Sequence, residues 1–316
     1  MSATLTQKEA TAFAPASVAN VAVGFDILGF AFPSLGDRVK VRQLPGELGL
    51  VRISPVSGSP DLPLDPKKNT ATRGLLRLLK DLNLDFGFQV EIEKGIPIGS
   101  GLGGSAASAV AAAVAANALL PQSLSLEELL PYCLDGEEVA SGARHGDNIV
   151  PSLYGGLQLV RSLDPLDILQ VSIPKQLFCV VIHPEAQIET RAARAILKPE
   201  IPLKKFVAQS ANLAGFIAAC YRSDFALMRR SLKDLIIEPQ RKSLIPGFDE
   251  IQAAALGAGA LGSSISGSGP SVFALCEGEA CAQEVKNQMV EALQQLGHSS
   301  KGAWLGAVSS TGARLL

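Results

Sequence analysis

The sequence predicts an α+β protein with two domains, and three observations support this. Residues 88–94 alternate apolar and polar side chains, which is typical of an antiparallel strand with one exposed face. An alanine-rich helical run, residues 105–120, follows soon after. Aspartates and prolines then interrupt the pattern over residues 162–176, before a second strand-like run at residues 177–183. A chain of 316 residues can bury one large core or two, and the interruption favours two.

The N-terminal elements follow from local patterns. Residues 11–14 read as a strand, and residues 36–65 combine short alternating runs with Gly, Pro and Asp, which predicts hairpins joined by loops. Leucines between residues 69 and 82 form one apolar helical face, with Asn69 or Thr70 as the expected cap.

The later elements are read in the same way. Residues 126–143 are helical by period, and residues 145–148 are expected to end that helix. Residues 204–234 predict a pair of helices, and residues 271–276 predict a strand after a glycine-rich segment.

Composition narrows the function classes. With 18% charged residues, a net charge of −2 and a pI near 6.0, the chain argues against a general nucleic-acid surface. The five cysteines are scattered and include no C-x-x-C pair, which fits free thiols in a reducing, cytoplasmic compartment. Residues 2–10 lack the apolar core of a signal peptide, and the run 105–120 is too short and alanine-rich to span a bilayer. We therefore expect no nucleic-acid or membrane partner.

A glycine-rich loop, residues 97–106, joins the alternating strand to the alanine-rich helix. Its four glycines permit conformations closed to other residues, and the first free N–H groups of the helix point outward, so the loop can hold a phosphate. A flexible glycine turn is the alternative. The loop satisfies G-x-G-x-x-G, but no second strand with an acidic end follows about 20 residues later. No lysine follows the glycines, so the Walker pattern fails and charge neutralisation must come from a metal or from elsewhere.

This loop resembles the central nucleotide motif of the GHMP kinases, the family of galactokinase and mevalonate kinase. Gly104 stands where that motif usually has a serine. On this resemblance the loop would bind ATP, while Ser105 and Glu137, which lies eight residues before His145, would hold Mg²⁺. The adenine would lie beside the start of the helix at residue 69. The nucleotide-binding residues implied are Asn69, Thr70, Pro97, Gly99, Ser100, Gly101, Leu102, Gly103, Gly104, Ser105 and Ala106.

Further segments are similar to signatures of the homoserine kinases, a narrower group within that family. Residues 15–29 resemble P-A-S-[ST]-A-N followed by G-F-D-x-L-G, with Val18 in place of the usual hydroxyl residue. The resemblance implies that Asn20 and Asp26 line a substrate pocket, where Asp26 would face an ammonium group. Because Asn and Asp beside glycines also favour turns, a purely structural role is the alternative.

Residues 145–156 resemble H-x-D-N-x-x-P…G-G, which implies that Asp147 contacts the substrate and that His145 and Asn148 lie near its hydroxyl. A simple helix cap is the alternative for the first two of these residues. Residues 262–273 resemble a third glycine-rich motif, which packs against the phosphate loop in the family, although a tight turn has the same composition.

Two shorter segments complete the implied substrate pocket. Residues 190–197 are similar to T-x-x-A-R, which implies substrate contacts from Thr190 and Arg194. Residues 238–241 resemble E-P-x-R, where Arg241 would fork a carboxylate.

The resemblances cover residues 11–316 and imply a two-domain GHMP kinase fold whose domains meet at a cleft. Residues 1–165 would form the ATP-binding domain, similar to domain 2 of ribosomal protein S5, and residues 166–316 a ferredoxin-like C-terminal domain. A left-handed β-α-β crossover is expected in the N-terminal half, against the usual handedness.

The implied activity is transfer of the γ-phosphoryl group of ATP to the side-chain hydroxyl of L-homoserine, giving O-phospho-L-homoserine for threonine biosynthesis. Positioning and charge neutralisation would do most of the work, and we assign no general base. A homodimer is a further expectation. Two alternatives stay open: a GHMP kinase for another small alcohol, such as mevalonate, which has no ammonium group, and a non-catalytic sensor that binds ATP.

Overall fold

The computed structural model describes residues 8–55, 57, 62–142 and 144–316. Its strands are β1 (Glu9–Ala19), β2 (Leu28–Pro45), β3 (Val51–Ile53), β4 (Phe86–Glu93), β5 (Leu157–Leu163), β6 (Leu166–Val171), β7 (Leu177–Pro184), β8 (Gly262–Ile265), β9 (Val272–Glu277), β10 (Ser300–Ala307) and β11 (Arg314–Leu315). Its helices are α1 (Thr70–Asp81), α2 (Gly104–Asn117), α3 (Leu126–Ser141), α4 (Gly146–Tyr154), α5 (Thr190–Ala195), α6 (Leu203–Arg222), α7 (Phe225–Ser231), α8 (Glu238–Arg241), the 3₁₀ turn η1 (Lys242–Leu244), α9 (Phe248–Gly257) and α10 (Glu279–Gln295).

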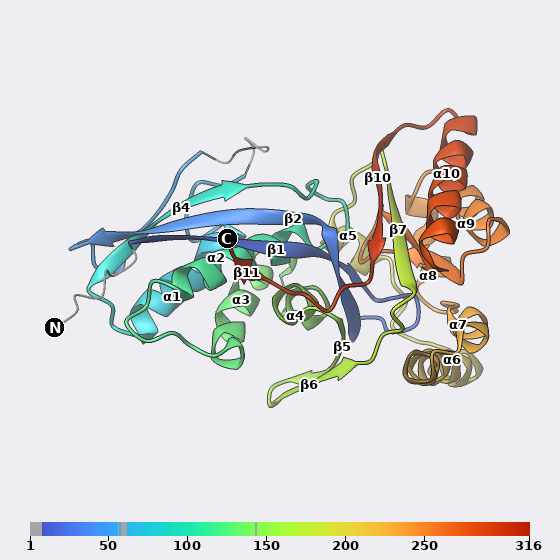
Figure 1. Cartoon of the computed structure of the whole chain (residues 1–316), viewed down its shortest axis with the longest axis horizontal. Coiled ribbons are helices and arrows are strands. Elements are labelled where there is room, and N and C mark those ends of the chain that lie inside the picture. Colours follow the sequence, from blue (N-terminus) through green and yellow to red (C-terminus); the bar gives the residue numbers. More distant parts are fainter. Residues whose placement is uncertain (1–7, 56, 58–61, 143) are drawn as a thin grey trace.

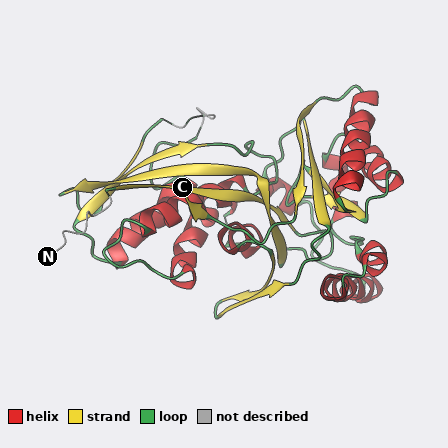
Figure 2. Ribbon diagram, viewed as in Figure 1, coloured by secondary structure: helices red, strands yellow, loops and turns green. Residues whose placement is uncertain are grey.

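These elements form two sheets with helices packed on them (Figures 1 and 2). A seven-stranded sheet has the order β11-β1-β2-β4-β3, and β5 and β6 extend it from β2. A four-stranded antiparallel sheet has the order β10-β7-β9-β8. In Figure 1, α1, α2, α3 and α4 lie beneath the larger sheet, while α9 and α10 cover the outer side of the smaller one. Among the described residues, no helix is both long and apolar enough to cross a membrane.

Helix α2 is the centre of the N-terminal half. Ten of its 14 residues are buried, mostly alanines, because it packs against β1 and β2 on one side and against α1 and α3 on the other. Small side chains let these elements approach closely, so the helix is held from all sides. Since α2 begins at Gly104, this packing fixes the position of the glycine loop that precedes it.

The helices on either side of α2 both begin at side-chain caps, of which the sequence analysis predicts the one at Asn69. Asn69 caps α1, and its side chain accepts a hydrogen bond from the Ala71 N–H. Ser125 and Glu128 form a reciprocal capping box at the start of α3. Left-handed Gly142 then ends α3. The expected strands at residues 11–14, 88–94, 177–183 and 271–276 are likewise present.

Three local expectations differ from the structure. Residues 36–65 do not form simple hairpins, because β3 pairs in parallel with β4 and does not pair with β2. Residues 162–176, read as an interruption, contain β6, which pairs with β5 in the larger sheet. Residues 145–148 do not end α3 but begin α4, with His145 at the N-cap. Pairing partners and helix starts such as these depend on contacts distant in sequence, which periodicity does not report.

The unit β3-α1-β4 is the parallel β-α-β crossover of the N-terminal half. Its left-handedness stays a prediction, as does the division of the chain between residues 165 and 166. Strand β11, from the end of the chain, pairs with β1, so the larger sheet draws strands from both ends of the sequence.

Candidate active site

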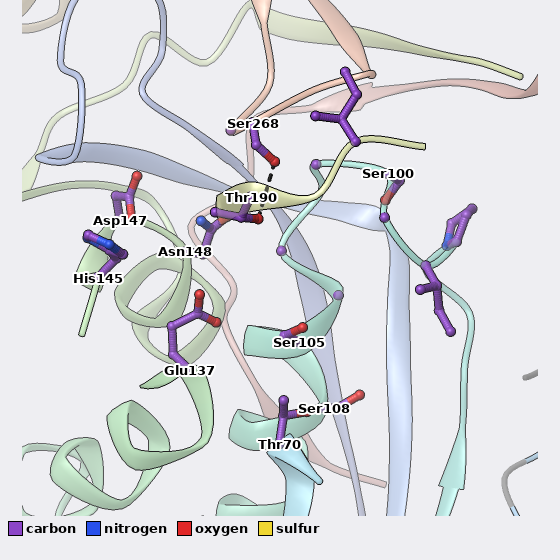
Figure 3. A pocket seen from close by; sticks show the side chains of 18 of the residues that line it. Thr70, Ser100, Ser105, Ser108, Glu137, His145, Asp147, Asn148, Thr190 and Ser268 are labelled. Carbon is purple, nitrogen blue, oxygen red and sulfur yellow. Dashed lines mark hydrogen bonds between the residues drawn. The ribbon is translucent and has the colours of Figure 1, made fainter. Parts of the chain in front are cut away.

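One pocket gathers side chains from both halves of the chain. Its walls come from the loop after β1, the start of α1, the glycine loop, α3 and α4, and from α5, α8 and residues 267–268. Figure 3 shows Glu137, Ser105 and Asn148 around the same space. The predicted site residues that line it are Asn20, Asp26, Asn69, Thr70, Pro97, Gly99, Ser100, Gly101, Gly103, Gly104, Ser105, Glu137, His145, Asp147, Asn148, Thr190, Arg194 and Arg241.

Two residues of the predicted nucleotide site, Leu102 and Ala106, do not line the pocket. Both are fully buried in the core beneath the glycine loop. Their apolar side chains anchor the loop and the first turn of α2, so they support the pocket wall from behind.

The glycine loop adopts backbone conformations that glycine alone accepts easily. Gly99, Gly101 and Gly103 all have left-handed φ values, of 66°, 75° and 67°. A Cβ at Gly101 would lie 2.6 Å from the carbonyl oxygen of Ser266, and one at Gly103 would lie 2.2 Å from Ser17 Oγ. The glycines are therefore required by close contacts as well as by backbone angle.

The glycine-rich segment of residues 262–273 packs against this loop, as expected from the resemblance. Ser266 Oγ donates to the Gly101 carbonyl at 2.8 Å, and the Ser271 N–H donates to the Ser100 carbonyl at 3.2 Å. Ser100 Oγ is buried and has no hydrogen-bond partner in the structure. A buried hydroxyl left unpaired at a phosphate-type loop is suited to a polar ligand.

The loop between β1 and β2 is strained. Asn20, Val21, Ala22 and Asp26 all have positive φ values between 45° and 69°, which is unusual for residues with side chains. Asn20 holds this loop in place, since its side chain donates to the Gly267 carbonyl at 2.8 Å and accepts from the Asp26 N–H at 3.0 Å. Such strain is characteristic of functional sites, and here it directs Asn20 and Asp26 to the pocket.

The first turn of α4 presents three predicted residues to the pocket (Figure 3). Asp147 is 4% exposed, and burial, followed by the nearby charge of Asp26, raises its pKa to about 7. Burial lowers the pKa of His145, which favours the neutral imidazole. Asn148 is oriented by Ser17, whose hydroxyl donates to its Oδ1 at 2.8 Å. His145 makes no side-chain capping hydrogen bond, which weakens the helix-cap alternative.

Two arginines from the C-terminal half complete the charged part of the pocket. Arg194 forms a two-point ion pair with Asp26, at 2.7 and 2.9 Å, and this raises the pKa of Arg194. Arg241 is 3% exposed and donates to the carbonyl oxygens of Ala193 and Gly267, at 2.9 and 3.3 Å. Burial, and then the charge of Arg194, lowers the pKa of Arg241.

Ser105 and Glu137 fit a magnesium ion that is shared with a nucleotide. Mg²⁺ takes oxygen ligands and is usually held by one or two carboxylates together with substrate phosphates. Ser105 offers a hydroxyl and Glu137 a carboxylate on the same pocket wall (Figure 3). Throughout the described ranges, no cluster of three or more His, Cys, Asp or Glu could hold a metal. The donor set therefore suits an ion completed by phosphate oxygens and water.

Lys94 also lines the pocket, although no sequence motif predicts it there. Its ammonium group pairs with the fully buried Asp37 and donates to the Gly104 carbonyl at 2.9 Å. Asp37 also accepts from Ser108 Oγ at 2.6 Å and from the Ile96 N–H at 3.1 Å. The cluster ties β2, the end of β4 and the first turns of α2 together. A lysine before the glycines was the available signal, but the Walker pattern asks only for one after them.

Two family models match this chain, and both describe GHMP kinases. Residues 69–156 match the family model of the GHMP kinases N terminal domain, and residues 216–295 match that of the GHMP kinases C terminal. A mevalonate kinase structure from L. major, 18% identical with a TM-score of 0.70, shares this fold. The pocket of glycine loop, serine and carboxylate described above thus lies in a GHMP kinase fold.

Relatives of higher identity include several homoserine kinases. One from Xylella fastidiosa (strain M12) is 49% identical over 98% of this chain and 95% of its own length. One from Chloroherpeton thalassium is 42% identical over 98% of this chain and 100% of its own. The crystal structure of homoserine kinase from Cytophaga hutchinsonii has 42% identity, a TM-score of 0.95 and full coverage of both chains. The chain therefore belongs to the homoserine kinases of the GHMP kinase family, which confirms the predicted family and fold.

Proposed function

We propose that this chain transfers the γ-phosphoryl group of ATP to the side-chain hydroxyl of L-homoserine, giving O-phospho-L-homoserine on the route to threonine. The observation that carries the proposal is a pocket with two buried and opposite charge positions beside a phosphate-type loop. Asp147 supplies the acidic position and Arg241 the basic one. In the part of the chain that the structure describes, no carboxylate lies within ion-pair distance of Arg241. A small zwitterion would supply both missing partners.

The charge of each buried group suits one end of an amino acid. A buried cation without an acidic partner is costly, so a ligand carboxylate beside Arg241 would be strongly favoured. An ammonium group beside Asp147 would lower the pKa of that carboxyl and keep it ionised. Mevalonate has a carboxylate but no ammonium group, so it would leave Asp147 unpaired.

Asp26 and Arg194 take a different part from the one expected of them. The sequence resemblance implies that both contact the substrate, whereas they pair directly with each other. We place this pair at the edge of the substrate site, where each partner keeps a side free for the ligand, since both side chains stay partly exposed and line the pocket. Thr190, whose hydroxyl lies 3.4 Å from that of Ser268, closes the same edge.

ATP would occupy the other end of the pocket. The N–H groups of the glycine loop and the start of α2 supply donors for the phosphates, and the unpaired Ser100 hydroxyl adds another. Lys94 lines this end of the pocket, but its charge is balanced by Asp37, so most of the phosphate charge is left to the backbone N–H groups and to Mg²⁺. Asn69 and Thr70, at the start of α1, line the part assigned to the adenine.

Ser105 and Glu137 would hold Mg²⁺, which neutralises charge on the phosphate oxygens when bound. His145 and Asn148 would lie beside the acceptor hydroxyl, with Asn148 fixed by Ser17. We assign neither as a general base, since a loose transition state needs little proton removal. The chain itself would bind the two reactants, orient them and exclude water from them.

The proposal is tested by ADP release from purified protein with Mg-ATP. Homoserine should start steady release, while mevalonate and the absence of any acceptor should give only background. Release with mevalonate would favour the other small-alcohol kinase. Tight ATP binding without any release would favour the non-catalytic sensor. The free thiols of all five cysteines agree with a cytoplasmic location, and a homodimer stays a prediction.

Replacing Glu137 by glutamine should reduce magnesium-dependent turnover by about 10²-fold or more, while homoserine binding changes little. The reason is that the lost charge serves the metal and not the amino acid. Turnover measured against Mg²⁺ concentration, with calorimetry of homoserine binding, checks this. Glu138→Gln is the matched control, because the adjacent Glu138 is exposed and pairs with Arg144 at 3.2 Å. Normal turnover of Glu137→Gln at low Mg²⁺ would show that the assignment is wrong.

A further inference from the structure

The ring of Phe25, which lines the pocket, contacts two arginines. The carbon Cζ of Arg194 lies 5.3 Å from the centroid of the Phe25 ring, and Cζ of Arg241 lies 5.1 Å from it. Each distance is within the range of an attractive cation–π contact. The other two such contacts in the described ranges, Arg77 with Tyr132 and Arg314 with Phe13, have one cation each and lie outside the pocket.

The ring is placed there by the strained loop between β1 and β2. Phe25 directly precedes Asp26, whose φ of 63° is left-handed and whose carboxylate pairs with Arg194. Two successive residues thus hold the same guanidinium group, one by charge and the other by the face of its ring. The Phe25 ring also contacts Arg241, which lies in α8, more than 200 residues later in the chain.

The two guanidinium groups need such a support because they repel each other. Burial, and then the charge of Arg194, lowers the pKa of Arg241, and within the described part of the chain the Arg241 guanidinium donates to two backbone carbonyls. The negative face of an aromatic ring attracts both cations. Unlike a carboxylate, it does so without neutralising either of them. An acidic side chain at this position would take the place of the anion that Arg241 is to bind.

We propose that Phe25 is a specificity-determining residue, whose ring holds Arg194 and Arg241 so that their charges converge on one ligand carboxylate. The inference deepens the proposed function and rests on it. Phe25 makes homoserine preferable to an otherwise identical amino alcohol that lacks the carboxylate. It acts through the two arginines as a positioning residue, and it takes no part in the chemistry at the phosphoryl group.

The test compares Phe25→Leu, which removes the ring, with Phe25→Tyr, which keeps its face. Phe25→Leu should raise KM for homoserine by about 5- to 50-fold, with kcat and the KM for ATP within about 2-fold of the parent. Phe25→Tyr should restore most of the lost binding. The second ligand is 2-aminobutane-1,4-diol, in which a CH₂OH group replaces the carboxylate. Its weak binding, measured by calorimetry, should hardly change in Phe25→Leu, so discrimination between the two ligands falls.

Control variants separate this role from a structural one. Tyr132→Leu removes the ring beneath Arg77, away from the pocket, and should leave both ligands unaffected. Phe25→Met provides a second ringless variant, and melting curves compare the stability of all of them. Equal homoserine binding in Phe25→Leu and the parent overturns the inference. So does an equal loss for homoserine and the diol, or a loss in Phe25→Tyr as large as in Phe25→Leu. Failure of the parent itself to phosphorylate homoserine would instead overturn the proposed function.

Discussion

Replacing Arg241 by alanine should lower kcat/KM for homoserine by about 30-fold to several thousand-fold, or roughly 2–5 kcal/mol, while ATP affinity is nearly preserved. The reason is that Arg241 is 3% exposed and lines the pocket, where its guanidinium group donates to two backbone carbonyls and not to a carboxylate of the described residues. Its removal leaves the carboxylate of the substrate buried without a partner, and an unpaired buried charge costs far more than an exposed one. Steady-state kinetics with homoserine, together with calorimetry of an ATP analogue, measures both quantities.

Arg229→Ala is a suitable control for this variant. Arg229 also donates to two backbone carbonyls, those of Ala260 at 2.8 Å and Gly259 at 3.1 Å, but it does not line the pocket. It should therefore affect stability alone. If Arg241→Ala phosphorylates homoserine as well as the parent does, the proposal that the pocket binds both charged groups of an amino acid is wrong.

Homoserine binding should weaken as the pH falls below about 7, with KM rising roughly 10-fold per pH unit. This follows from Asp147, whose pKa in the ligand-free protein is raised to about 7 by burial and by the charge of Asp26. Below that pH the carboxyl is protonated and cannot pair with an ammonium group. Asp147→Asn should bind homoserine more weakly at pH 8 and should lose the pH dependence. A pH series of kcat/KM for both proteins checks this.

Asp147 should also make the free energy of unfolding depend on pH, in the opposite direction to an ordinary ion-paired carboxylate. Its pKa is above the usual value of 3.8, so between about pH 4 and pH 7 the folded chain binds more protons than the unfolded chain. The contribution of Asp147 to stability therefore falls as the pH rises through this window. Asp147→Asn should remove this decline in urea titrations. Asp249→Asn, an exposed carboxylate paired with Lys242 at 2.8 Å, should leave both pH profiles unchanged.

Much of the site could be predicted from the sequence because its parts are short local signals. Four glycines in eight residues, a helix of small residues after them and the order of the acidic and basic signatures can all be recognised from residue type and short spacing. The same is true of the α1 and α3 caps, where one side chain bonds to the backbone two or three residues away. Such features need only local geometry, so sequence patterns report them well.

The sequence did not indicate which side chains pair with each other when they lie far apart in the chain. Lys94 pairs with Asp37 across 57 residues, and nothing near either one marks the pair. Strand β3 runs parallel to β4 because α1 carries the chain back to the sheet, which the alternation of β3 alone cannot show. Asp26 and Arg194 were both identified as pocket residues, but their direct pairing depends on how α5 meets the loop after β1.

By itself, then, the sequence determined the family and identified many of the residues that line the pocket, since these depend on residue type and short spacing. Only the tertiary structure decided how the charges are distributed among them. Burial gives Asp147 its raised pKa, Asp26 pairs with Arg194, and the Phe25 ring contacts guanidinium groups from α5 and α8. The physical reason is that electrostatic interactions depend on distance and on exclusion of water, and both are set only when segments distant in sequence come together.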